Sequence, residues 1–221
     1  MQQALVIGSS GGIGSALCAA LTEQGWQVTG LSRSADGLDM TSEHSVAQHL
    51  GALDGPFSRI IIATGALEID SHTPEKALKH LNAEGMAAQF ALNTIGPALV
   101  MKYALRLLPK DTPAVVAALS ARVGSIGDNR AGGWHSYRAS KAALNQIIRG
   151  AAIELGRSHP QTICVALHPG TVATPFTEKY LGRHPAVPPD DAAANLLRVM
   201  DGLSPDQSGE FFDWAGKPVP W

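Results

Sequence analysis

The stretch ALVIGSSGGIG, residues 4–14, decides how this chain folds. A short apolar run, residues 4–7, ends at Gly8, and a turn rich in glycine continues to Gly14. Glycines allow a tight turn and let the backbone approach a pyrophosphate, while free N–H groups at the start of the next helix attract negative charge. The position of this turn, between a strand and a helix, predicts a dinucleotide-binding βα unit.

Two other glycine motifs are excluded. Residues 8–12 fit the GxSxG pattern of a hydrolase nucleophile elbow, but that elbow follows a sheet that has already formed upstream. Only seven residues precede Gly8, too few for such a sheet. The phosphate-binding loop of nucleoside triphosphatases requires a Gly-Lys pair, and no such pair follows this turn.

Buried-strand patterns and helical patterns alternate along the chain. The predicted strands are residues 4–7, 28–31, 60–63, 114–119, 163–167 and 211–212. The predicted helices are one that carries Ile13, Leu17 and Leu21 on one face, then 42–50, a helix opening at Thr73, 83–108, 137–155 and 190–200. The alternation predicts a single α/β domain, residues 1–221, with a doubly wound parallel sheet of the Rossmann type. The irregular stretch at about 171–189 is expected to be a substrate loop.

Composition excludes several classes of function. The chain has 221 residues, of which 45% are hydrophobic and 16% charged, and its net charge is −2. The sequence contains no block of five like charges, which argues against a nucleic-acid partner. No apolar run approaches the roughly 18 residues that a membrane helix needs. Cys18 and Cys164 form no CxxC, and the histidines show no metal-ligand spacing, so no metal site is expected. We expect a cytoplasmic protein.

A second motif carries acid–base chemistry. Tyr137 and Lys141 are four residues apart and therefore share a helix face. A free tyrosine has a pKa near 10, and a neighbouring ammonium group should lower that pKa toward the working range. The pair is thus a candidate for proton transfer.

Asn93 is a third candidate. Pro97 has no N–H, so the carbonyl of Asn93 loses its helical partner, and Gly96 weakens the helix further. A carbonyl freed in this way can hold a water molecule.

With these motifs together, the sequence resembles the short-chain dehydrogenase/reductase family. The family pattern is a GxxxGxG turn, here residues 8–14, and a Tyr-x-x-x-Lys, here residues 137–141. Residues 63–65 (Ala-Thr-Gly) resemble the family's NAG segment with Thr at its second position, and residues 169–174 resemble its PG-x-V-x-T motif. The segments 93–97 and 123–126 and the pair Gly132-Gly133 look most like C-factor-like and sniffer-type carbonyl reductases.

The resemblance implies hydride transfer between NADP(H) and a small carbonyl or alcohol substrate. The catalytic residues that it implies are Tyr137, Lys141 and Asn93, and Ser120 is the candidate for the catalytic serine of the family. In the family, the lysine also binds the nicotinamide ribose, and the asparagine carbonyl anchors a relay water. The expected cofactor-binding residues are Gly8, Ser10, Gly12, Ile13, Gly14, Ser32, Arg33, Asp39, Met40, Ala63, Thr64, Gly65, Tyr137, Lys141, Pro169, Gly170, Val172 and Thr174.

The end of the second strand predicts the choice of cofactor. An acidic residue there binds the free 2′-hydroxyl of NAD, whereas an arginine suits a 2′-phosphate. This chain has Ser32-Arg33 and no acid at that point, which favours NADP(H). Asp39 and Met40 are expected near the adenine. The stretch between Arg33 and Asp39 is too short for the helix that family members usually carry, so we expect a loop and an abbreviated sheet edge.

The chain departs from the family at the catalytic serine. Counting back from Gly124 puts Ala121 at that position. Ser120 lies at the carboxyl edge of the sheet and is the preferred candidate. Ser125, in the following loop, and a mechanism with no serine are the two alternatives.

Two other functions stay open: a dihydropteridine- or quinone-type reductase, and a dinucleotide-binding signalling protein that does not turn over. The intact Tyr137/Lys141 pair argues against the second. The apolar surface of helices 83–108 and 137–155 predicts a homodimer or homotetramer.

Overall fold

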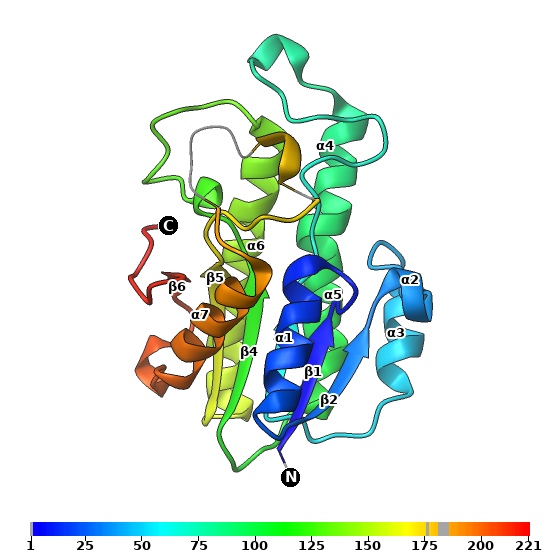
Figure 1. The fold of residues 1–221 in the computed structure, drawn as a ribbon, viewed down its shortest axis with the longest axis vertical. Helices are drawn as coiled ribbons and strands as arrows, with labels where there is room; N and C mark the ends of the chain where they lie inside the picture. Colours follow the sequence, from blue (N-terminus) through cyan, green and yellow to red (C-terminus); the bar gives the residue numbers. More distant parts are fainter. Residues whose placement is uncertain (1, 176, 181–185) are drawn as a thin grey trace.

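A computed structural model describes residues 2–175, 177–180 and 186–221, and the described strands form one parallel sheet in the order β2-β1-β3-β4-β5-β6 (Figure 1). These strands are β1 (Gln3–Ile7), β2 (Gln27–Leu31), β3 (Arg59–Ile62), β4 (Ala114–Leu119), β5 (Thr162–His168) and β6 (Phe211–Asp213). All neighbouring strands pair in parallel. The predicted doubly wound α/β fold is therefore confirmed.

Helices cover both faces of the sheet (Figure 1). One face carries α1 (Gly12–Glu23) and α7 (Pro189–Asp201), and the other carries α3 (Glu43–Gly51), α5 (Gly96–Ala104) and α6 (His135–Ser158). In β3, Ile60 and Ile62 pack under α5 and α6, whereas Ile61 packs under α1 and α7. Successive side chains of a strand point to opposite faces, so a strand covered on both sides is apolar throughout.

The topology places a crevice beside β1. From β1 the chain forms α1 and then β2 on one side of β1, and it next crosses to β3 on the other side. In such sheets, ligands bind outside the carboxyl ends of the strands at the point where the order reverses. The glycine turn leaves β1 at that point. The sheet ends at β2, so the expected abbreviated edge is confirmed.

Two local predictions are wrong. The stretch after Arg33, expected to be a loop, begins with the helical turn α2 (Arg33–Asp36), because the buried Ser32 caps it by accepting a hydrogen bond from Ala35 N at 3.2 Å. The helix expected to open at Thr73 does not form. That segment is irregular apart from a 3₁₀ turn, Leu78–His80.

The next helix instead begins after Asn82, whose side-chain oxygen accepts from Gly85 N at 2.9 Å. The single helix expected over residues 83–108 is composite. It consists of α4 (Ala83–Phe90), a π-helical segment (Ala91–Ile95), α5 and a final 3₁₀ turn (Leu105–Leu107). The wide π-helical turn directly precedes Gly96 and Pro97. Since proline donates no backbone hydrogen bond, ordinary helical bonding is interrupted there, as the sequence predicts.

The expected substrate loop at 171–189 is described only in part. Residues 176 and 181–185 lie outside the described residues, and Pro189 already belongs to α7. In the described part of the chain, no helix is both long and apolar enough to span a bilayer.

Candidate active site

A cavity of about 370 Å³ opens at the carboxyl ends of the strands. Fourteen of the residues predicted from the sequence line it: Ser10, Gly12, Ile13, Gly14, Ala63, Thr64, Gly65, Ser120, Tyr137, Lys141, Pro169, Gly170, Val172 and Thr174. They come from segments up to 164 positions apart in sequence, counted from Ser10 to Thr174. The parallel topology brings these segments to one edge of the sheet.

The glycine turn is built so that backbone atoms touch. Gly8 has a φ of +90°, and a Cβ there would lie 2.8 Å from the carbonyl oxygen of Ala63. A Cβ on Gly14 would clash with the carbonyl oxygen of Gly8. The first turn of α1 begins after Gly11 with neither a side-chain cap nor an acidic residue. Its N–H groups and the helix dipole therefore suit an anionic group in the cavity.

The lining of the cavity has features that suit a bound nucleotide cofactor. A Cβ on Gly12 would lie 2.7 Å from Thr174 Cγ2, so the turn approaches the opposite wall closely. Thr64 Oγ1 and His168 Nδ1 are buried beside the cavity and have no hydrogen-bond partner among the described residues. Buried polar atoms without a partner are uncommon and point to a ligand that supplies one.

The four residues expected at the adenosine end do not line this cavity. The end of β2 nonetheless lies beside the glycine turn, because Leu31 O accepts from Gly8 N at 2.7 Å. Arg33 is exposed there, and hydrogen bonds from Thr41 and the charge of Arg33 hold the Asp39 pKa below its usual value. Ser32 is occupied with capping α2. Met40 is buried in the core against Gly96, so its contact with adenine stays a prediction.

Tyr137 and Lys141 project from the first turns of α6 into the cavity. Lys141 Nζ lies 6.0 Å from the centre of the Tyr137 ring and donates to Leu119 O at 2.9 Å. Burial lowers the pKa of the Lys141 ammonium to about 8 and raises the pKa of the Tyr137 phenol, since burial disfavours both charged forms. The expectation that Lys141 lowers the Tyr137 pKa is therefore wrong for the protein without a bound cofactor, because burial raises that pKa instead.

Asn93 is fully buried behind the cavity and holds the loop that follows β3. Its Oδ1 accepts from Ala66 N at 3.0 Å, and its Nδ2 donates to Ala66 O at 2.9 Å and to Gln89 Oε1 at 2.5 Å. A Cβ on Gly65 would lie 2.8 Å from Asn93 Oδ1 and 3.2 Å from Lys141 Nζ. Glycine at position 65 thus lets the amide and the ammonium approach the same backbone.

The two candidate serines have different environments. Ser120 is buried in the cavity wall, where its hydroxyl donates to Asn145 Oδ1 at 2.6 Å. Ser125 does not line the cavity. Its hydroxyl donates to Pro220 O and accepts from Asp128 N, so it fastens the C-terminal segment. Geometry therefore favours Ser120.

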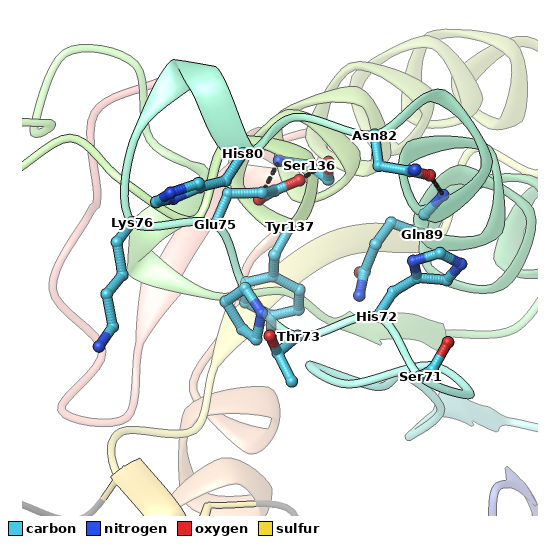
Figure 2. Close-up of a pocket in the computed structure, with 12 residues that line it drawn as sticks. Ser71, His72, Thr73, Glu75, Lys76, His80, Asn82, Gln89, Ser136 and Tyr137 are labelled. Atoms are coloured by element: carbon cyan, nitrogen blue, oxygen red, sulfur yellow. Dashed lines mark hydrogen bonds between the residues drawn. The ribbon is translucent and has the colours of Figure 1, made fainter.

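Sequence reasoning missed Glu75, which caps α6 from a distant loop. The residue that precedes α6, Trp134, has a φ of +50° and provides no side-chain cap. Instead, Glu75 O accepts from Trp134 N at 2.5 Å, and the Glu75 carboxylate accepts from the backbone N–H of Ser136 at 3.1 Å and from its hydroxyl (Figure 2). The start of the helix that carries Tyr137 is thereby fixed. No local pattern links residues 61 positions apart.

Comparison with known proteins agrees with this geometry. A family model described as enoyl-(acyl carrier protein) reductase matches residues 7–202. The chain belongs to the short-chain dehydrogenase/reductase family. This oxidoreductase family contains a Rhodococcus relative, 1-hydroxy-2-glutathionyl-2-methyl-3-butene dehydrogenase, which is 31% identical over the full length of both chains. The C-signal protein of Myxococcus xanthus is 38% identical over 66% of this chain and 84% of its own.

Solved structures of short-chain dehydrogenases/reductases share the fold. The carbonyl reductase Sniffer of Drosophila melanogaster superimposes with a TM-score of 0.82 over all of both chains, at 19% identity. An NADPH-bound carbonyl reductase from chicken fatty liver gives a TM-score of 0.80 over 100% of this chain and 94% of its own, at 22% identity. The likeness to C-signal agrees with the C-factor-like subgroup expected from the sequence, and the likeness to Sniffer shows the same fold.

The Glu75 cap can be tested by its removal. Glu75→Ala removes both hydrogen bonds from Ser136 to the carboxylate and leaves only the backbone bond from Trp134 N to the carbonyl of residue 75. We expect the free energy of unfolding to fall by about 1–3 kcal/mol. Urea unfolding measures it. Glu84→Ala removes an exposed first-turn carboxylate of α4 and should change that free energy by less than about 0.5 kcal/mol. Equal effects of the two substitutions would contradict the cap.

The same cap has a pH dependence with a definite sign. Burial raises the pKa of the Glu75 carboxyl, but the Ser136 hydrogen bonds and the nearby His135 lower it more, so its folded-state pKa lies below the usual value. Its stabilisation is therefore present above the ordinary pKa and is lost as the pH falls through the folded-state value. The stability difference between the wild type and Glu75→Gln should narrow over that acidic range.

Proposed function

We propose that this protein reduces a small carbonyl compound with NADPH. The observation that carries the proposal is that Tyr137 and Lys141 line the same cavity as the glycine turn. A proton donor and the binding site expected for a hydride donor therefore share one space. The cavity is lined by more apolar than polar surface, which suits a small organic substrate.

The cofactor residues divide into three groups. The glycine turn would hold the pyrophosphate, and Ala63, Thr64 and Gly65 would lie along the cofactor. The segment 169–174 would border the nicotinamide. When bound, the reduced nicotinamide supplies the hydride.

The protein's own groups handle the proton. Burial keeps the Tyr137 phenol protonated at neutral pH, so Tyr137 donates the proton to the carbonyl oxygen. The Lys141 ammonium, with a pKa of about 8, stabilises the phenolate left behind. A water on the Asn93 carbonyl, at the interrupted helix, would return the proton through Lys141. Ser120 would polarise the substrate carbonyl by turning toward it the hydroxyl proton that it donates to Asn145 Oδ1 in the structure.

Two alternatives give different results in one assay. NADPH oxidation is followed with aldehydes and ketones, with quinones, and with a quinonoid pterin. Turnover of aldehydes or ketones supports the proposal. Turnover of only quinones or the pterin indicates a quinone- or dihydropteridine-type reductase instead. The similarity to C-signal supports a signalling function as the other alternative. A protein that binds NADPH but reduces none of the tested compounds would fit that function.

Tyr137→Phe keeps the buried ring and removes the proton donor. We expect kcat for carbonyl reduction to fall by about two decades or more, the contribution of a positioned general acid. Lys141→Ala should cost a similar factor and also weaken cofactor binding. Steady-state NADPH oxidation gives kcat, and NADPH fluorescence titration gives Kd. Full activity of the Phe variant would make Tyr137 a purely structural residue.

Arg33→Asp should exchange the preferred cofactor. An aspartate repels a 2′-phosphate and accepts a hydrogen bond from a free 2′-hydroxyl, whereas the exposed guanidinium binds the phosphate. Values of Kd for NADPH and NADH, measured by fluorescence titration, should favour NADPH in the wild type and NADH in the variant. An unchanged preference would refute the role of Arg33.

Ser120→Ala tests carbonyl polarisation. A hydroxyl that stabilises a developing oxyanion contributes ~2–4 kcal/mol, so kcat should fall by that equivalent at saturating NADPH. Ser125→Ala is the matched control, since the Ser125 hydroxyl is occupied outside the cavity. A fall confined to Ser125→Ala would reverse the assignment, and no fall in either variant would favour reduction by Tyr137 alone.

We also propose that the chain assembles as a homodimer or homotetramer. A hollow of about 500 Å³ between α5 and α6 is lined mainly by apolar residues, among them Met101 and Ile147. Ile147 and Ile153, both on α6, are 38% and 50% exposed. A two-fold contact between copies of these helices would cover that surface.

A further inference from the structure

A second cavity, of about 340 Å³, adjoins the first at Tyr137, which lines both. We call it the polar chamber. Its other walls are the loop that follows β3 (residues 71–76 and His80), the first turns of α4 and α6, and Gln89. Figure 2 shows His72 and Gln89 on one side of Tyr137, and Glu75 and His80 on the other. A substrate whose carbonyl lies at Tyr137 can therefore extend into this chamber.

The chamber has a defined shape on the side of His72. The backbone of His72 forms a bridge with Ile69 through hydrogen bonds of 2.9 and 3.2 Å. Its ring packs on Gly85, where a Cβ would lie 2.9 Å from His72 Cγ and 3.0 Å from its Nδ1. Glycine at position 85 thus makes room for the imidazole against the start of α4.

The carboxylate and amide oxygens that line the chamber already have partners. The Glu75 carboxylate accepts from the N–H and the hydroxyl of Ser136. Gln89 Oε1 accepts from Asn93 Nδ2, and its amide donates to Leu67 O at 2.9 Å. Asn82 Oδ1 accepts from Gly85 N. The acceptors that remain are weaker ones, the hydroxyls of Ser71 and Thr73 and the imidazole nitrogens, and these groups can donate as well.

The donors are in the opposite situation. Within the described residues, the imidazoles of His72 and His80 and the exposed ammonium of Lys76 have no hydrogen-bond or ion-pair partner. A lysine ammonium offers three donors and no acceptor, and a neutral imidazole offers one donor and one acceptor. A ligand that satisfies such a set must carry acceptors, and a charged acceptor makes the stronger bonds.

We propose that the polar chamber binds a carboxylate of the substrate, so that the compound reduced at Tyr137 is an oxo acid. This inference rests on the proposed carbonyl reduction. A singly charged carboxylate suits the chamber better than a dianionic phosphate, because the charged Glu75 side chain lies in the same wall. His72 would bind the carboxylate on one side of Tyr137, and the exposed Lys76 side chain, which lies on the other side, would turn toward it while the substrate carbonyl lies against Tyr137 (Figure 2).

The experiment compares two aldehydes of one length, 6-oxohexanoate and its methyl ester, with NADPH. The wild type should show a kcat/KM about tenfold higher for the acid, the difference expected for one charge-assisted hydrogen bond. Lys76→Met and His72→Phe should each abolish most of that preference. Lys79→Met is the matched control, because this neighbouring lysine does not line the chamber, and it should retain the preference.

Several results would overturn the inference. These are an equal kcat/KM for acid and ester in the wild type, an unchanged preference in Lys76→Met and His72→Phe, or a higher kcat/KM for an aldehyde phosphate than for the acid. Binding of unreactive hexanoate against hexanamide, followed by NMR titration, needs no turnover. If no carbonyl compound is reduced but hexanoate binds in a Lys76-dependent way, the proposed function fails and the chamber stands. If carbonyls are reduced but hexanoate binds no better than hexanamide, the chamber fails alone.

Discussion

A lysine ammonium buried at the carboxyl ends of parallel strands is the constraint on which the rest of the site depends. Removing such a cation from water costs several kcal/mol unless polar groups replace the lost hydration. The fold supplies a carbonyl from the last residue of β4, and it keeps position 65 free of a side chain so that the loop after β3 can lie against the amine. Asn93 then fixes that loop from behind. The long helix, the central strands and the loop are thus held together around one charge.

The parts of this arrangement that were predictable are those with a local signature. The glycine turn, the apolar runs of the strands and the Tyr-x-x-x-Lys spacing each depend on a few consecutive residues, and the predicted strands agree with the structure to within about two residues. Pro97 also revealed the interruption at Asn93. What it could not reveal was the form of that interruption, because proline removes one hydrogen bond and leaves open whether the helix kinks or widens.

The parts that failed are those decided by tertiary contact. Residues 73–75 read as a helix start because Thr-Pro-Glu is a common opening sequence. In the structure, the carboxylate of Glu75 caps a different helix, α6, so the segment stays extended toward it. The cap that Ser32 provides to α2 was likewise not predicted, and its contact with the cofactor stays a prediction. The pairing of Gln89 with Asn93 went unnoticed, although their four-residue spacing was visible.

The π-helical segment also sets an angular register. Each residue of an α-helix turns the chain by about 100°, so one residue more or fewer rotates everything upstream by that amount. The wide turn at Ala91–Ile95 accommodates such an extra residue while the chain stays helical from α4 to α5. Upstream of it, Gln89 and the first turn of α4 face the loop after β3, and downstream of it the residues of α5 face the sheet. Loss of one residue from this turn would rotate α4 away from the site, so the width of a single turn sets how the loop after β3 meets the core of the sheet.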